Sequence, residues 1–167
     1  MNVRLLRLIT LSSFVAVGVV ISPLLRIEGM CPTAHLVNIV CAVLLGPYYA
    51  LACAAAIGII RMAVMGIPPL ALTGAVFGAF FSGVLYRLGG NRLIFAVLGE
   101  IAGTGIIGSL VSYPVMAFIW GRAEISLFFY TPMFIGATLM GGSAAYVLLK
   151  LLSANGALSK MQKKLKG

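Results

Sequence analysis

The side chains that could do chemistry are few, and Glu100 is the most informative of them. It lies about eight residues into a long apolar segment, residues 93–120, or roughly 12 Å along a helix axis. A carboxylate at that depth in a hydrocarbon environment is costly unless it is paired, protonated or facing a wet cavity. Two interpretations follow: Glu100 is a hydrogen-bonded structural residue, or it faces a ligand pocket.

The helix face that carries Glu100 continues with hydroxylated and small residues. Thr104 follows Glu100 at i+4, and Gly108 follows Thr104 at i+4, so the three share one helix face. Such a face suits the wall of a ligand pocket. The alternative is a close helix–helix contact, which Gly103, Gly105 and Gly108 would permit. The two interpretations are compatible.

Three further polar candidates lie on two earlier apolar segments. His35 and Asn38 are three residues apart and share a face near one end of residues 33–45, and Arg61 lies toward the end of residues 48–64. A pocket role competes with a structural one, because a lone histidine commonly serves as a hydrogen-bonding partner and an arginine can extend to the interface. His35 is the only histidine, so neither a metal site nor another cofactor is predicted.

Aromatic residues gather where residues 93–120 end and residues 127–152 begin. An interfacial aromatic belt explains most of them. A flat heteroaromatic ligand would also stack on such rings and hydrogen-bond to a phenol, and Tyr130 is the candidate for that role. The other members are Tyr113, Trp120, Phe128, Phe129 and Phe134.

Composition indicates that lipid is the solvent for these elements. Of the 167 residues, 62% are hydrophobic and 9% are charged, whereas soluble domains are about 25% charged. A span needs about 20 apolar residues, so the length accommodates six short-looped spans and no soluble catalytic domain. We expect one integral membrane domain over residues 1–167, ending in a basic cytoplasmic tail over residues 153–167.

Glycine, proline and charged residues divide the chain into six apolar segments, which predicts an all-α bundle of six transmembrane helices. The second and third are the weakest, because together they could form a broken or tilted pair. The expected helices cover residues 5–25, 33–45, 48–64, 70–85, 93–120 and 127–152.

The basic residues are distributed unevenly between the two ends of the expected bundle. Three lie at or near one end, Arg26, Arg61 and Arg122, in the company of Glu28 and Glu124. By the positive-inside rule the other end, with both termini, is cytoplasmic in a multi-pass plasma membrane protein. That end carries nine: Arg4, Arg7, Arg87, Arg92, Lys150, Lys160, Lys163, Lys164 and Lys166.

The sequence lacks the features that would indicate nucleic-acid binding or enzymatic activity. The net charge of +9 is concentrated at segment ends, where it would meet anionic lipid rather than nucleic acid. No phosphate-binding GK[ST] loop, HExxH or GxSxG motif occurs, and the chain has no aspartate, so no enzyme is predicted. A membrane enzyme acting on lipid headgroups and an autonomous facilitator remain the alternatives to a substrate-capture protein.

Four short motifs, in this order and spacing, resemble the ThiW family. They are CPTAHLVNI at residues 31–39, LGP at 45–47, IRM at 60–62 and GEIAGTG at 99–105. ThiW is the proposed thiazole-specific substrate-binding (S) component of energy-coupling factor (ECF) vitamin transporters. The resemblance extends over essentially the whole chain.

This resemblance implies a six-helix protein with cytoplasmic termini and a pocket near the outer face, covered by the loop between the first two helices. It also implies docking on a transmembrane T component coupled to two ATPases, with toppling in the membrane to release substrate. In relatives a small-xxx-small motif on the first helix contacts the T component. Ser12 and Ala16 have that spacing here, with Ser12 replacing the first alanine; packing inside the bundle is the alternative.

The ligand that the resemblance implies is 4-methyl-5-(2-hydroxyethyl)thiazole, a thiamine precursor, with thiamine or hydroxymethylpyrimidine as alternatives. In thiamine-binding relatives the fifth helix and the start of the sixth line the pocket, which favours Glu100, Thr104 and Tyr130. The thiazole has one ring-nitrogen acceptor, one hydroxyl and an apolar ring. His35, Asn38, Arg61 or Tyr130 could donate to the nitrogen, and Glu100 could accept from the hydroxyl.

Overall fold

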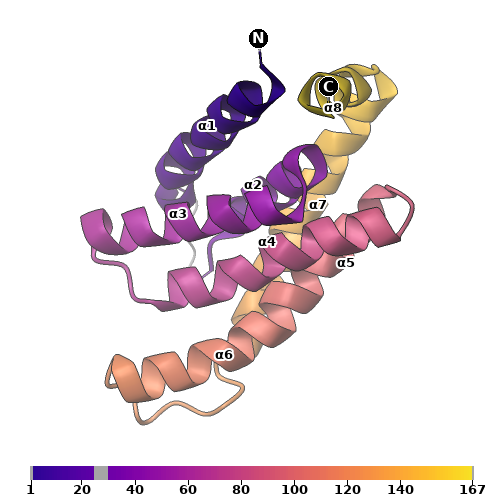
Figure 1. The fold of residues 1–167 in the computed structure, drawn as a ribbon. Helices are drawn as coiled ribbons and strands as arrows, with labels where there is room; N and C mark the ends of the chain where they lie inside the picture. Colours follow the sequence, from indigo (N-terminus) through magenta and orange to yellow (C-terminus); the bar gives the residue numbers. More distant parts are fainter. Residues whose placement is uncertain (1, 25–29, 167) are drawn as a thin grey trace.

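The computed structural model describes residues 2–24 and 30–166, which form helices and connecting turns without a β-strand (Figure 1). The fifth apolar segment is one long helix in which α and wider π turns alternate, and a further helix follows the last expected span. The elements are α1 (Val3–Leu24), α2 (Pro32–Leu45), α3 (Pro47–Met65), α4 (Leu70–Leu88), α5 (Leu93–Glu100), η1 (Ile101–Gly108), α6 (Ser109–Pro114), η2 (Val115–Ile119), α7 (Thr131–Ala154) and α8 (Ala157–Lys166).

The breaks between helices lie where the sequence places glycine and proline. Gly46, with φ of 92°, separates α2 from α3, and Pro47 occupies the first turn of α3, a position where proline costs no hydrogen bond. Gly66, in the left-handed conformation, ends α3. Because these residues interrupt helices for local reasons, the predicted boundaries are close to the observed ones for the first five segments.

Helix length and composition are those of a multi-pass membrane protein. Five helices are long and apolar enough to cross a membrane, namely α1, α3, α4, α7 and the continuous Leu93–Ile119 helix. The sixth expected span, α2, has 14 residues, or about 21 Å of helix, against a hydrocarbon core of about 30 Å.

Helix α2 is the centre of the bundle. It packs against α1, α3, α4, α5 and α7, and all but two of its residues are buried. A helix that is apolar on every side is expected in such a position. The two polar side chains near its start, His35 and Asn38, are consequently enclosed by protein and need partners there.

Small residues bring the long fifth helix against α4. A Cβ at Gly99 or Gly103 would collide with the backbone of Phe81 or Phe77, respectively, and one at Gly108 would lie 2.8 Å from a backbone oxygen of α4. Such close approach is typical of helix pairs in membranes. It places Glu100 and Thr104 directly beside α4.

Two segments near the C-terminus differ from expectation. Residues 127–130, predicted to begin the last span, form turns, and α7 begins at Thr131. The predicted basic tail contains a helix, α8, whose Leu158 and Leu165 are buried. These leucines are seven residues apart and therefore lie on one helix face. The prediction of a tail rests on its lysines alone, without regard to this spacing.

Candidate functional site: a buried polar cluster beside a cavity

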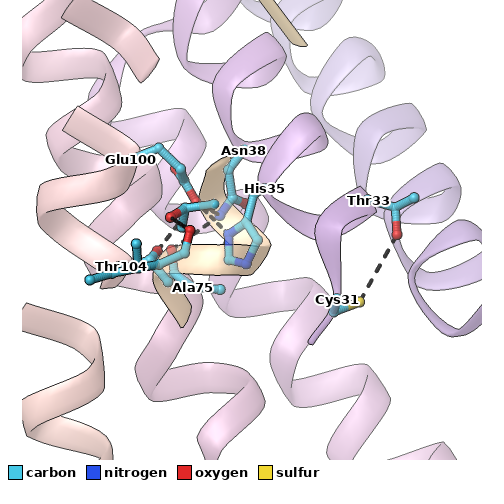
Figure 2. Close-up of polar contacts among 9 residues, drawn as sticks. Cys31, Thr33, His35, Asn38, Ala75, Glu100 and Thr104 are labelled. Carbon is cyan, nitrogen blue, oxygen red and sulfur yellow. Dashed lines mark hydrogen bonds and ion pairs between the residues drawn. The ribbon is translucent and has the colours of Figure 1, made fainter. Parts of the chain in front are cut away.

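Glu100 is fully buried and accepts hydrogen bonds from three side chains on one of its oxygens. His35 Nδ1 lies 2.8 Å, Asn38 Nδ2 3.0 Å and Thr104 Oγ1 3.2 Å from Glu100 Oε1. Figure 2 shows these groups converging from α2 and the long fifth helix. Hydrogen bonds to a charged acceptor stabilise by about 1.5–3 kcal/mol each, so the cluster offsets much of the cost of burying a carboxylate.

The neighbours of the cluster determine which groups donate. The Asn38 amide nitrogen also donates to the backbone oxygen of Ala75, at 3.3 Å, and because a carbonyl can only accept, the amide orientation follows. Because an ionised carboxylate can only accept, His35 Nδ1 carries a proton and is the third donor to Oε1. Glu100 Oε2 has no hydrogen-bond partner among the described residues and remains an available acceptor.

Gly78 of α4 provides the space in which the cluster forms. A Cβ at this position would collide with Thr104 Oγ1 and would lie 2.7 Å from Glu100 Oε1. Thr104 belongs to the π-helical stretch η1 that begins directly after Glu100. Wide turns of this kind are frequent at functional sites, and this one still leaves Thr104 within hydrogen-bonding distance of Glu100.

A cavity of about 60 Å³ lies beside the cluster, among α2, α3, α4, η1 and α7. It exceeds the roughly 30 Å³ that a water occupies in the liquid and is smaller than the roughly 150 Å³ cavity that binds benzene in another protein. A substituted ring would therefore need side chains to move. The lining is mainly apolar: Cys31, Ala34, His35, Arg61, Ile67, Leu70, Ala71, Gly74, Ala75, Thr104, Phe134 and Ala137.

Arg61 faces this cavity from the last turns of α3 and is only 5% exposed. Its Nε has no hydrogen-bond partner, and no carboxylate lies within ion-pair distance of it, among the described residues. An unpaired buried cation is costly and marks a functional site by default within a membrane. The structural interpretation required the Arg61 side chain to extend to the membrane interface, but the side chain is buried.

Four candidate pocket residues do not line the cavity: Asn38 and Glu100, which reach it only through the polar cluster, and Gly108 and Tyr130. Gly108 packs on the backbone of Gly74, which corresponds to the helix-contact interpretation. Tyr130 is buried, but it is not among the residues lining the cavity; its ring lies 5.9 Å from that of Phe134, and its hydroxyl has no partner among the described residues.

On the first helix, Ser12 and Ala16 are exposed and line a groove between α1 and α3. They are therefore not packed inside the described bundle, which was the alternative interpretation of their spacing. Glu28, in the expected loop between the first two helices, lies outside the described residues.

Sequence reasoning missed Phe134, Gly74 and Gly78 as site residues. Phe134 was noted only as part of the aromatic belt, although it lines the cavity. A Cβ at Gly74 would lie 2.8 Å from the Phe134 ring, so the glycine provides the space that the ring occupies. The signal that could have identified the two glycines is their spacing of four residues in α4, which places them on one helix face.

A bundle of apolar helices that encloses a polar cluster and a small cavity is the architecture of a membrane transport protein rather than of a soluble enzyme. A family model described as "Thiamine-precursor transporter protein (ThiW)" matches residues 8–155. The chain therefore belongs to the ThiW family, which is a family of transporters. Neither the curated proteins nor the solved structures contain a match.

Proposed function

We propose that this chain is the substrate-capture (S) subunit of an ATP-driven ECF importer and that it binds 4-methyl-5-(2-hydroxyethyl)thiazole. The observation that carries the proposal is the pairing of a cavity with two unsatisfied buried polar groups of opposite kind. Arg61 is a donor that faces the cavity, and Glu100 Oε2 is a free acceptor at the adjacent cluster.

The thiazole matches these groups in number and kind. Its ring nitrogen would accept from Arg61, its hydroxyl would donate to Glu100, and its apolar ring would lie against Phe134. Stacking on an aromatic side chain and a few well-placed polar contacts are typical of small-molecule sites. The cavity of about 60 Å³ favours a single-ring ligand over thiamine, which has two rings.

The topology is consistent with capture from outside. Arg7 Nε donates to the backbone oxygen of Leu165 at 2.6 Å, so the two termini lie at the same end of the bundle, as six crossings that include the short α2 would require. The positive-inside rule makes that end cytoplasmic. The cavity lies among the opposite helix ends, near Cys31, Arg61 and Leu70, and would open outward.

An importer of this kind needs an external energy source. The sequence contains no ATP-binding loop, so a T component and two ATPase subunits would supply the energy. The exposed groove of α1 and α3, with Ser12 and Ala16 at its surface, is the surface that we assign to the T component, because small residues permit close helix contact.

Isothermal titration calorimetry on the purified chain tests the ligand assignment. We expect saturable binding of hydroxyethylthiazole and weaker or absent binding of thiamine and hydroxymethylpyrimidine. A flat titration with the thiazole would refute the assignment. Uptake into liposomes that contain this chain alone would instead identify a facilitator and contradict the S-subunit role.

A further inference from the structure

A second, larger cavity lies at the end of the bundle that holds both termini. Its volume is about 510 Å³, and it is bordered by α1, the α2–α3 junction, the end of α4 and α8. That volume is within the range of small-molecule sites, about 300–1,000 Å³. The thiazole site is formed by the opposite ends of these helices, so this cavity is separate from it.

Two arginines line this second cavity without acidic partners. Arg7 and Arg87 both border it, and neither forms an ion pair with a carboxylate of the described residues. The acidic residues of the chain are Glu28, Glu100 and Glu124, which belong to other segments. Among the described residues, no carboxylate therefore neutralises the positive charge at this cavity.

The two guanidinium groups lie against the backbone at this cavity, Arg7 half-buried and Arg87 exposed. Arg7 uses its Nε to donate to Leu165, which leaves its two terminal nitrogens for other acceptors. The Arg87 guanidinium lies over Gly46, where any Cβ would collide with it, and φ of 92° disfavours a larger residue in any case. Arginine forks of this kind suit the oxygens of a phosphate.

Helix α8 closes one side of this cavity. Gln162 Nε2 donates to the backbone oxygen of Val43 at 2.9 Å and to the Tyr86 hydroxyl at 3.1 Å, while Leu165 contributes to the lining. The apolar face of α8, with Leu158 and Leu165, packs on the bundle, and its outer face carries exposed lysines, which an anionic membrane surface would attract. These lysines are Lys160, Lys163 and Lys164.

We propose that this cavity binds the phosphate group of an anionic phospholipid, with Arg7 and Arg87 as its ligands and α8 lying on the membrane surface beside it. Tyr48, which is 73% exposed and also lines the cavity, stands at the rim, as tyrosines do at membrane interfaces. Basic pockets between transmembrane helices on the cytoplasmic side bind such headgroups. The site is independent of thiazole capture.

The test is a titration of the purified full-length chain, in neutral detergent, with three probes followed by intrinsic fluorescence and thermal unfolding. The probes are dihexanoyl phosphatidylglycerol, dihexanoyl phosphatidylcholine and inorganic phosphate. We expect saturable binding of phosphatidylglycerol only. Equal responses to the two lipids would overturn the proposal, and so would saturation by inorganic phosphate alone, which would make the ligand a soluble anion.

Two double variants distinguish binding by the cavity arginines from a general attraction to the positive charge of this end of the bundle. Arg7→Gln with Arg87→Gln should weaken phosphatidylglycerol binding at least about tenfold, the loss expected when hydrogen bonds between a guanidinium and a phosphate are removed. Arg4→Gln with Arg92→Gln removes the same charge at the same end from positions that do not line the cavity and should change binding by less than about threefold. Equal weakening in both pairs would overturn the proposal, and the wild-type lipid comparison stands even if one pair fails to fold.

Discussion

Glu100 on the fifth helix and His35 on α2 are joined by a 2.8 Å contact between Oε1 and Nδ1, although 65 residues separate them. This contact links the two helices in the interior of the bundle, where Glu100 is fully buried and His35 is only 6% exposed. It uses only one carboxylate oxygen. The other, Oε2, has no partner among the described residues, and that difference between the two oxygens underlies the first prediction.

Replacing Glu100 by glutamine keeps the side-chain shape but removes the charge and one acceptor. If Oε2 accepts the ligand hydroxyl, thiazole binding should weaken by about ten- to a hundredfold, the range expected for a hydrogen bond to a charged group. Calorimetry measures the change. Glu124→Gln is the control, because Glu124 is exposed in the loop after η2; equal affinity in wild type and Glu100→Gln would exclude Glu100 as a ligand contact.

Arg61→Met should separate a binding role from a structural one. Methionine has a similar length and no charge, so the ligand-free protein should unfold at the same or a higher temperature, because an unpaired buried cation is removed. Thiazole binding should fall at least tenfold. Thermal unfolding with and without ligand gives both values, and Arg122→Met, at an exposed position, is the control. A clear loss of ligand-free stability would instead indicate that Arg61 holds the fold together.

Gly78→Ala tests whether the space at α4 is required by the cluster. The added methyl group would displace Thr104 and Glu100, and overpacking of this kind costs about 1–3 kcal/mol. We expect reduced thermal stability and weaker thiazole binding together. Gly136→Ala on α7 is the control, since the nearest atom to its Cβ is Met30 Sδ at 3.4 Å. Unchanged stability in Gly78→Ala would show that the cluster adapts easily.

The helices could be predicted from the sequence because their ends depend on local features, such as Gly46 with Pro47 and the apolar runs between them. The partners of Glu100 could not, because the contact with His35 depends on how α2 is rotated within the bundle. The same holds for Arg61, whose burial follows from the packing of α3 against its neighbours. Likewise α8 was missed as a helix because its burial comes from contacts with α1, α2 and α7.

Phe134 and Tyr130 should differ in their importance for binding although they are neighbours. Phe134→Leu should weaken thiazole binding by about three- to tenfold, the effect of losing an aromatic contact. Tyr130→Phe should change it by less than about twofold, because Tyr130 does not line the cavity and its hydroxyl has no hydrogen-bond partner among the described residues. Calorimetry on both variants, with lipid-facing Phe118→Leu as the control, checks the ranking; a larger loss in Tyr130→Phe would return Tyr130 to the ligand contacts.

Ser12→Leu and Ala16→Leu should impair transport without impairing capture. Both residues lie at the surface of the α1–α3 groove and neither lines the thiazole cavity, so calorimetry should give the wild-type affinity. The larger side chain would keep a partner helix at a distance, and co-purification with the T component should be lost. Ser13→Leu adds the same bulk at an adjacent exposed position that does not line the groove and should assemble normally. If all three variants assemble alike, the T component docks elsewhere on the chain.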